Sequence, residues 1–169
     1  MTASMTFGTT SLANLAGVDP RLVTAAKMAL SFSTQDFGFP DPNTRTLAQE
    51  EALVAQGKSH TLKSHHIPPP APGKGTFYNG VAYSGAVDCV PWNGNAFVWD
   101  WNLIYLIWHA WRRVAELTGN PYTWGGVWDK LITEYDDPES EMNAYIARQK
   151  AAGNEHPFVD GPHFEWGPN

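Results

Sequence analysis

Apolar side chains recur at helical spacing along much of the chain, most clearly over residues 102–117. The apolar positions of this stretch fall on one face of a helix. They are Leu103, Ile104, Ile107, Trp108, Trp111, Val114 and Ala115. Gly119 and Pro121 follow and predict the end of the helix, because neither residue continues it well.

Three other stretches carry helix start and stop signals. One helix is predicted to begin at Pro20, with Asp19 as the preceding cap. A second is predicted over residues 46–56, where Gly57 follows as a C-terminal stop. A last helix is predicted across residues 137–153, which begin with Asp-Pro and end with glycine.

Short apolar runs between these helices predict strands. Residues 86–90 form one such run around a single charge, Asp88. Asn93-Gly94 is a turn signal, so residues 97–101 are predicted to return as the second strand of a hairpin. Residues 124–128, WGGVW, predict a glycine-kinked strand or turn. Because helices and short strands do not alternate regularly, the pattern favours an α+β fold with helices flanking an antiparallel sheet.

Length and composition favour one globular domain over residues 1–169. The sequence is 43% hydrophobic and 17% charged, and no compositional break separates a second, wall-binding or other module. The net charge of −6 argues against a nucleic-acid partner, which would need a basic face. Most of the eight tryptophans must belong to the core, although aromatic residues in that number also suit a cleft for an extended polymer or peptide.

The same sequence contains no predicted targeting or membrane segment. The N-terminal residues lack the charged and apolar regions of a secretory signal. The longest apolar stretch, near residues 103–110, is too short to span a bilayer. The single cysteine, Cys89, excludes an internal disulfide and suits synthesis in a reducing compartment.

Three polar residues stand in apolar or constrained settings. Asp88 lies within a hydrophobic strand, where an unpaired carboxylate would cost several kcal/mol. His66 ends a polar run before a proline-rich loop, and His163 lies between Pro162 and Phe164. Two imidazoles and one carboxylate with an open fourth position form the ligand set of a catalytic zinc site.

Spacing alone leaves this zinc hypothesis open. A histidine in an aromatic setting is more often a satisfied core residue than a ligand, and a strand carboxylate can simply pair with arginine. No HExxH or CxxC pair connects residues 66, 88 and 163. Asp160, three residues before His163, would be the base that takes a proton from the attacking water.

Taken together, these segments resemble the VanY-type zinc D,D-/L,D-peptidases, and in particular the phage L-alanyl-D-glutamate endopeptidases. The signature of that family runs Ser-x-His, Gly-x-Ala-x-Asp and Asp-x-x-His. The matching segments here are Ser64-His65-His66, Ala86-Val87-Asp88 and Asp160-Gly161-Pro162-His163-Phe164-Glu165. Residues 44–59 and 124–128 resemble the entry segment and the WGG-W segment of the family. The likeness extends over residues 12–166 and implies a Hedgehog/D,D-peptidase-like fold with a zinc cleft.

The resemblance implies a role for each matching residue. His66, Asp88 and His163 would hold Zn²⁺, and Asp160 would be the general base. Arg45 would bind a substrate carboxylate or the oxyanion, and Ser64 and Trp124 would line the cleft. Glu165 would orient a metal ligand. His66 is chosen over its neighbour His65 because it is two residues after Ser64.

This chain departs from the family pattern in a few places. A proline-rich insert, about residues 67–83, lengthens the loop between the first histidine and the aspartate, and we expect it to form a rim over the cleft. A helical insert occupies about residues 134–153. Ser84 replaces the usual glycine, and the Glu-Gln pair of the family appears reversed as Gln49-Glu50.

The sequence therefore predicts a zinc peptidase that cuts the stem peptide of bacterial peptidoglycan, at the L-alanyl-D-glutamate bond. A D-alanyl-D-alanine carboxypeptidase and a non-catalytic, zinc-stabilised murein-binding or virion protein are the alternatives. We expect a monomer that is made in the cytoplasm of an infected cell and acts on the wall after release, with a Gram-negative host.

Overall fold

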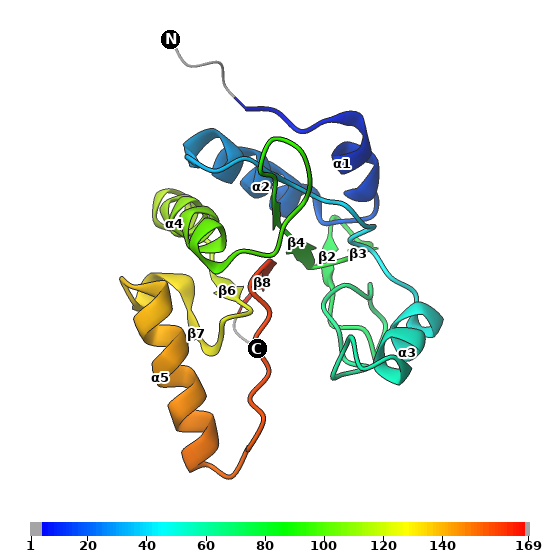
Figure 1. Cartoon of the computed structure of the whole chain (residues 1–169). Helices are drawn as coiled ribbons and strands as arrows, with labels where there is room; N and C mark the ends of the chain where they lie inside the picture. Colours follow the sequence, from blue (N-terminus) through cyan, green and yellow to red (C-terminus); the bar gives the residue numbers. More distant parts are fainter. Residues whose placement is uncertain (1–4, 168–169) are drawn as a thin grey trace.

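The computed structural model describes residues 5–167, so the ends of the predicted 1–169 domain lie outside the described residues. Helices and short antiparallel strands are mixed in one small α+β domain, as predicted (Figure 1). Its helices are α1 (Thr9–Asn14), α2 (Pro20–Phe32), α3 (Leu47–Ala55), α4 (Trp101–Thr118), α5 (Pro138–Ala151) and the 3-10 helix η1 (Ile132–Glu134). None of the helices within residues 5–167 is long and apolar enough to cross a membrane.

The main sheet has four antiparallel strands in the order β4-β8-β6-β7. These strands are β4 (Ala86–Asp88), β6 (Tyr122–Trp124), β7 (Val127–Leu131) and β8 (His163–Trp166). Two further pairs lie outside it: β1 (Phe37–Gly38) with β5 (Val90–Pro91), and β2 (Thr76–Tyr78) with β3 (Val81–Tyr83). The strand nearest the C-terminus, β8, is thus an interior strand of the main sheet.

Helices α2 and α4 pack on one face of this sheet and contribute many of the buried apolar residues. Trp111 of α4 stacks on Phe164 of β8, with ring centroids 4.9 Å apart, and meets Tyr122 of β6 edge-on. All three side chains are fully buried. Burial of a phenylalanine contributes roughly 1.5–3 kcal/mol, so this contact fastens β8 to the helical layer.

Because side chains alternate across a strand, the residues next to Phe164 point to the opposite face of the sheet. These residues are His163 and Glu165. In the register between β4 and β8, Asp88 lies opposite His163 and Val87 lies opposite Phe164. The face that the two helices leave free therefore carries the polar residues.

The structure confirms the predicted starts of α2 and α3 and the predicted glycine stop after α3. Asp19 accepts a hydrogen bond from the Arg21 backbone N–H, and Pro20 is the first helical residue of α2. Thr46 and Gln49 form a capping box at the start of α3. Gly57 follows α3 with φ of 69°, the left-handed conformation typical of a glycine stop.

The predicted return strand over residues 97–101 is wrong. The turn at Asn93-Gly94 does form, but the pairing stops after an isolated bridge between Phe97 and Trp92 and one hydrogen bond from the Val98 N–H to the Pro91 carbonyl at 3.0 Å. Asp100 instead accepts a hydrogen bond from the Asn102 backbone N–H and caps α4. Trp101 cannot belong to a strand and to a helix at once. The cap at Asp100 starts α4 at Trp101, so the strand cannot extend over residues 97–101.

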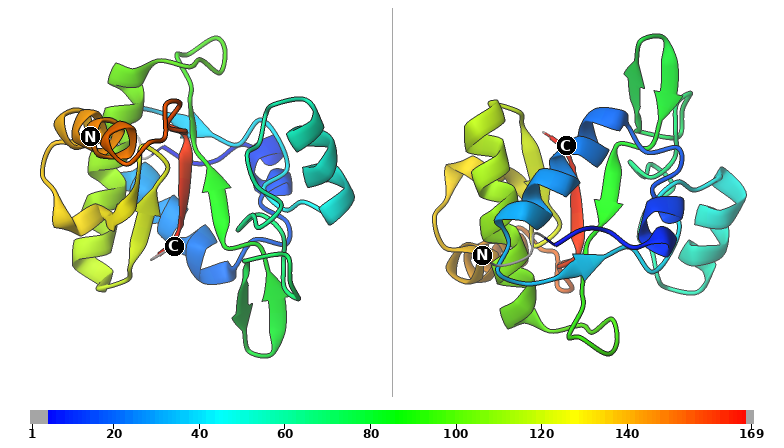
Figure 2. Two further views of the ribbon diagram at one scale, coloured as in Figure 1. Left: turned by 90° about the horizontal axis from the view of Figure 1, so that it is seen from below. Right: turned by 90° about the horizontal axis from the view of Figure 1, so that it is seen from above.

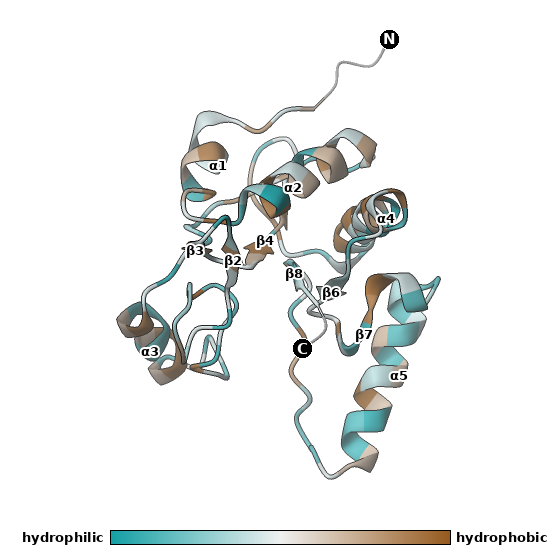
Figure 3. Ribbon diagram, turned by 180° about the vertical axis from the view of Figure 1, so that it is seen from behind, coloured by the Kyte–Doolittle hydropathy of each residue, from teal (hydrophilic) through white to brown (hydrophobic). Residues whose placement is uncertain are grey.

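The two predicted inserts form separate features. Residues 67–83 contain the β2–β3 hairpin, which projects from the rest of the molecule (Figure 2). The second insert forms α5, which is largely hydrophilic (Figure 3) and buries only Pro138, Met142 and Tyr145. Helices α3 and α5 lie on opposite sides of β8 (Figures 1 and 2).

Candidate functional site

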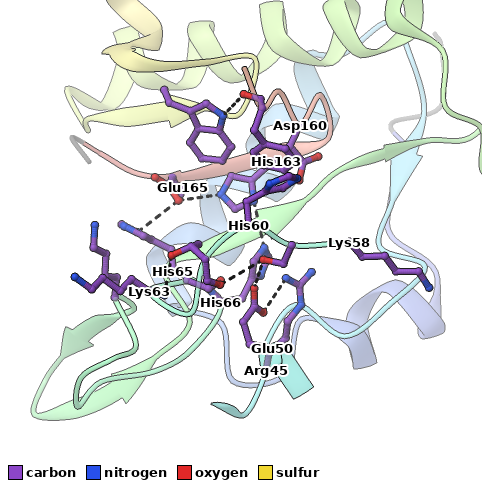
Figure 4. A pocket seen from close by; sticks show the side chains of 16 residues that line it. Arg45, Glu50, Lys58, His60, Lys63, His65, His66, Asp160, His163 and Glu165 are labelled. Atoms are coloured by element: carbon purple, nitrogen blue, oxygen red, sulfur yellow. Dashed lines mark hydrogen bonds and ion pairs between the residues drawn. The ribbon is translucent and has the colours of Figure 1, made fainter. Parts of the chain in front are cut away.

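The three predicted ligand groups, His66, Asp88 and His163, converge on the polar face of the sheet. Figure 4 shows two of them, His66 and His163. The Oδ1 atom of Asp88 lies 3.0 Å from His163 Nδ1 and 3.2 Å from His66 Nε2. The two imidazole nitrogens are 3.2 Å apart. Residues 66, 88 and 163 thus form a group that could hold a metal ion. Asp88 and His163 meet because they are opposite each other across two paired strands.

His66 reaches the group from a loop that is fixed by backbone hydrogen bonds. Its N–H donates to Ser64 Oγ at 3.2 Å, and its carbonyl accepts from the Arg45 N–H at 2.9 Å. The ring is buried, with Nδ1 placed 2.8 Å from the Asn43 carbonyl. The neighbouring His65 points elsewhere, with Nδ1 at 3.7 Å from Glu165 Oε2. The structure therefore brings His66, and not His65, to the other two ligand groups.

The outer hydrogen bonds of the two imidazoles assign their tautomers. Nδ1–H of His66 donates to the Asn43 carbonyl, and Nε2–H of His163 donates to Glu165 Oε2 at 2.9 Å. The inner nitrogens then present lone pairs to each other and to Asp88. Three acceptors at 3.0–3.2 Å repel one another unless a cation or a shared proton lies between them. This donor set fits a divalent metal ion, and Glu165 contacts the outer nitrogen of His163, where a residue that orients a metal ligand would lie.

The charges of the group shift the protonation of its members. Burial would lower the pKa of His163, but hydrogen bonds to Asp88 and Glu165 outweigh burial and raise that pKa to about 10. Burial would raise the pKa of Asp88, yet the imidazoles of His66 and His163 hold it well below its ordinary value. The metal-free site therefore keeps a positive charge next to the Asp88 carboxylate.

Asp160 lines the same cavity as His163 and is held there by its backbone. Its N–H donates to the Gly125 carbonyl at 2.8 Å, and its carbonyl accepts from the His163 N–H at 3.2 Å. A Cβ atom at Gly125 would lie 2.3 Å from the Asp160 carbonyl oxygen, so only glycine permits this approach. Burial, with a smaller contribution from the charge of Asp88, raises the pKa of Asp160 to about 6.

Arg45 contacts both Asp88, a member of the group that could hold a metal ion (the metal group: His66, Asp88 and His163), and the buried acid Glu50. One guanidinium nitrogen lies 2.9 Å from Asp88 Oδ2, and another lies 3.3 Å from Glu50 Oε2. Glu50 is 1% exposed and also accepts a hydrogen bond from Ser59 Oγ at 2.6 Å. Since Oδ2 of Asp88 is occupied by Arg45, Oδ1 is the oxygen that faces the two imidazoles.

A cavity of about 420 Å³ adjoins these residues. Aromatic rings form one wall: Trp128 stacks on Phe158, Phe158 contacts His60, and Trp128 contacts His163. Ser64 lines the cavity, as predicted. Among residues 67–83, Lys74 alone contributes to the lining, so most of the proline-rich insert is not a rim of this cavity.

The prediction that Trp124 lines the cleft is wrong. In the register of β6 and β8, Trp124 lies opposite Phe164, on the helical face of the sheet, and is fully buried. Its indole N–H donates to the Gly161 carbonyl at 2.6 Å and so supports the loop that carries Asp160. The tryptophan that reaches the cavity is Trp128, four residues later.

Sequence reasoning also missed Glu50, Asn43 and the lysines of the cavity. Glu50 follows the capping box of α3, which offered a signal for its place in the first helical turn. Asn43 holds the site twice: its carbonyl faces His66 Nδ1, and its side-chain oxygen accepts from the Asp88 N–H at 2.6 Å. Lys58, Lys63 and Lys74 line the cavity, and no motif marks them in the sequence.

Comparisons with known proteins agree on one type of relative. A protein-family model described as phage L-alanyl-D-glutamate peptidase matches residues 3–166. The crystal structure of the Serratia marcescens L-Ala D-Glu endopeptidase ChiX is similar, with a TM-score of 0.63 and 26% sequence identity. The match covers 99% of this chain and 96% of that one. No curated protein sequence matches the chain.

Proposed function

Because the chain belongs to the phage L-alanyl-D-glutamate peptidase family, and its function is that of a peptidoglycan peptidase, we propose that a zinc ion serves its reaction. His66, Asp88 and His163 would hold this ion, and the bond that is cut would be the L-alanyl-D-glutamate bond of the stem peptide. The observation that carries the proposal is the convergence of three potential ligand atoms, one from each residue, at 3.0–3.2 Å from one another.

Zinc is favoured by the chemistry of the donor set. Two imidazoles and one carboxylate leave a fourth position open in a tetrahedral site, which is typical of catalytic zinc. When bound, zinc polarises a carbonyl group and lowers the pKa of an attacking water toward ~7. Asn43 and Glu165 hold the outer nitrogens of the two ligand rings, and such partners raise the metal affinity of imidazole.

Asp160 would act as the general base. Its carboxylate lines the cavity next to His163, and its raised pKa of about 6 suits a group that exchanges protons near neutral pH. In the proposed reaction, a carboxylate oxygen of Asp160 accepts a proton from the attacking water. The same oxygen then donates this proton to the nitrogen of the leaving amine, which restores the ionised carboxylate.

Arg45 would have two tasks. Its guanidinium fixes Asp88 through Oδ2, and it lines the cavity with 23% of its side chain exposed. A cation at that place would also attract the negative charge that develops on the scissile carbonyl oxygen. Ser64 would keep the His66 loop in place by accepting the His66 N–H.

Purified protein incubated with isolated murein tests the proposal, with mass spectrometry of the released peptides. We expect peptides with a new glutamyl amino terminus, loss of the activity with a chelator and recovery with added zinc. Release of free D-alanine instead would identify a carboxypeptidase. Undiminished cleavage after complete metal removal would contradict the zinc requirement. We further propose that the protein is made in the cytoplasm of an infected cell and acts on the wall after release.

A further inference from the structure

Lys63 and Lys74 lie next to Ser64, two residues before the proposed ligand His66. Lys63 is the sequence neighbour of Ser64, and the Lys74 N–H donates to the Ser64 carbonyl at 3.0 Å. Both side chains line the cavity. Ser64 in turn accepts the His66 N–H, so both lysines are two short steps from a proposed metal ligand. Residues 63 and 74 are brought together although the chain between them runs through the proline-rich insert.

The lysines that line the cavity form no ion pair with a carboxylate among the described residues. Within residues 5–167, no ion pair joins Lys58, Lys63 or Lys74 to a carboxylate. The glutamates of the cavity have other contacts: Glu50 binds Arg45 and Ser59, and Glu165 binds His163. Three of the six lysines line this one cavity, in a chain whose net charge is −6. Cations are thus concentrated where substrate would bind.

We propose that Lys63 and Lys74 form a subsite for a carboxylate of the substrate, namely the free carboxylate of the glutamyl residue at the scissile bond. The inference rests on the proposed function. A glutamyl residue has two carboxyl groups, and only one of them is used in the bond to the next residue. The other stays ionised at neutral pH, because an unperturbed carboxyl has a pKa near ~4.

The opposite side of the cavity offers a matched control. Lys58 also lines the cavity, but Lys58 and Lys63 lie on opposite sides of His66 (Figure 4). The same charge change at Lys58 therefore tests whether place, and not merely total charge, decides recognition. Lys27 is exposed on α2, does not line the cavity and controls for net charge.

The experiment compares two synthetic peptides that differ in one group: the free glutamyl carboxylate and its carboxamide. The ratio of kcat/KM for the two peptides is measured for the wild type, for Lys63→Gln/Lys74→Gln, for Lys58→Gln and for Lys27→Gln. Exposed charge pairs are each worth little, so we expect the wild type to prefer the free acid by about fivefold to tenfold. In the double variant the ratio should approach one, and higher salt should weaken the preference of the wild type.

A second readout does not depend on turnover. Calorimetry measures the Kd of the glutamyl product peptide, and of its carboxamide, with the metal-free wild type and double variant. Only the wild type should bind the acid more tightly than the amide. An equal preference for the acid in the wild type and the double variant would overturn the subsite, as would a wild type that does not distinguish the peptides. A wild type that binds the acid but cuts neither peptide would overturn the proposed function and leave the carboxylate subsite supported.

Discussion

Glu50 is a buried acid that never touches the metal group, yet the structure predicts that metal binding depends on it. It contacts Arg45 at 3.3 Å and accepts from Ser59 at 2.6 Å, and Arg45 holds Oδ2 of Asp88. Replacement by alanine removes both contacts and leaves Arg45 with Asp88 alone. Replacement by glutamine removes the charge but keeps the shape, since its amide can donate to Ser59 while its oxygen faces Arg45.

The two replacements should lower the free energy of unfolding by different amounts. At 3.3 Å and an effective dielectric constant near 20, the attraction between Glu50 and Arg45 is about 5 kcal/mol before desolvation is counted. Arg45 is partly exposed, and burying Glu50 has its own cost, so the net contribution is much smaller. We expect Glu50→Ala to lower the free energy of unfolding by about 2–3 kcal/mol and Glu50→Gln by about 1 kcal/mol.

Zinc affinity should also fall more for Glu50→Ala than for Glu50→Gln. Without its second partner, Arg45 no longer fixes Asp88 in one orientation. Loss of such supporting contacts costs 10–100-fold in metal affinity, so we expect about tenfold weaker zinc binding for Glu50→Ala. Competition with a chromogenic chelator measures the affinity, and urea unfolding of the metal-free protein measures stability.

Glu51→Ala is the matched control, because Glu51 is the next residue of α3 and is exposed. Glu51→Ala should change neither the zinc affinity nor the free energy of unfolding appreciably. If Glu50→Ala and Glu51→Ala gave the same zinc affinity within a factor of about two, the argument that Glu50 acts on the metal group through Arg45 would be refuted.

The remaining predictions concern the base, its loop and the pH. Asp160→Asn should lower kcat by about 10²–10⁴-fold with unchanged zinc content, and a loss below tenfold would contradict the role of base. Trp124→Phe removes the donor to the Gly161 carbonyl and should lower the free energy of unfolding by about 1 kcal/mol; unchanged urea unfolding would show that this bond does not hold the loop. In the metal-free protein, the pKa of His163 is raised from 6.5 to about 10, so its contribution to stability is complete below pH 6.5 and is lost as the pH rises toward 10. Urea midpoints at several pH values check this fall, and a midpoint that rises over that range would contradict it.

Most of the helical layer could be predicted from the sequence because its signals are local. Caps at Asp19 and Thr46 and the apolar stripe of residues 102–117 each act within a few residues. The segment at residues 97–101 failed because two local signals competed there. Its aromatic residues favour a strand, but Asp100 can cap a helix, and the helix forms.

The structure brings His66, Asp88 and His163 together as a group that could hold a metal ion, but the residues around this group were not all predicted. Whether Trp124 or Trp128 faces the cavity depends on strand register, and a shift by one residue would exchange the two faces of the sheet. Likewise, the contact between Arg45 and Asp88 joins positions 43 residues apart, which no periodic pattern relates. The residue types at positions 66, 88 and 163 therefore suggest candidate metal ligands. The residues that contact them depend on strand register and on long-range contacts, which the sequence does not reveal.

The placement of β8 between β4 and β6 has a consequence for biosynthesis. Translation proceeds from the N-terminus, so β4, β6 and the whole helical layer are made before the strand that joins them. Until residues 163–166 have left the ribosome, Asp88 has no His163 opposite it, and the nascent polypeptide lacks one of the three groups that could hold a metal. The group that could hold a metal ion therefore forms only after β4, β6 and the helical layer have been synthesised.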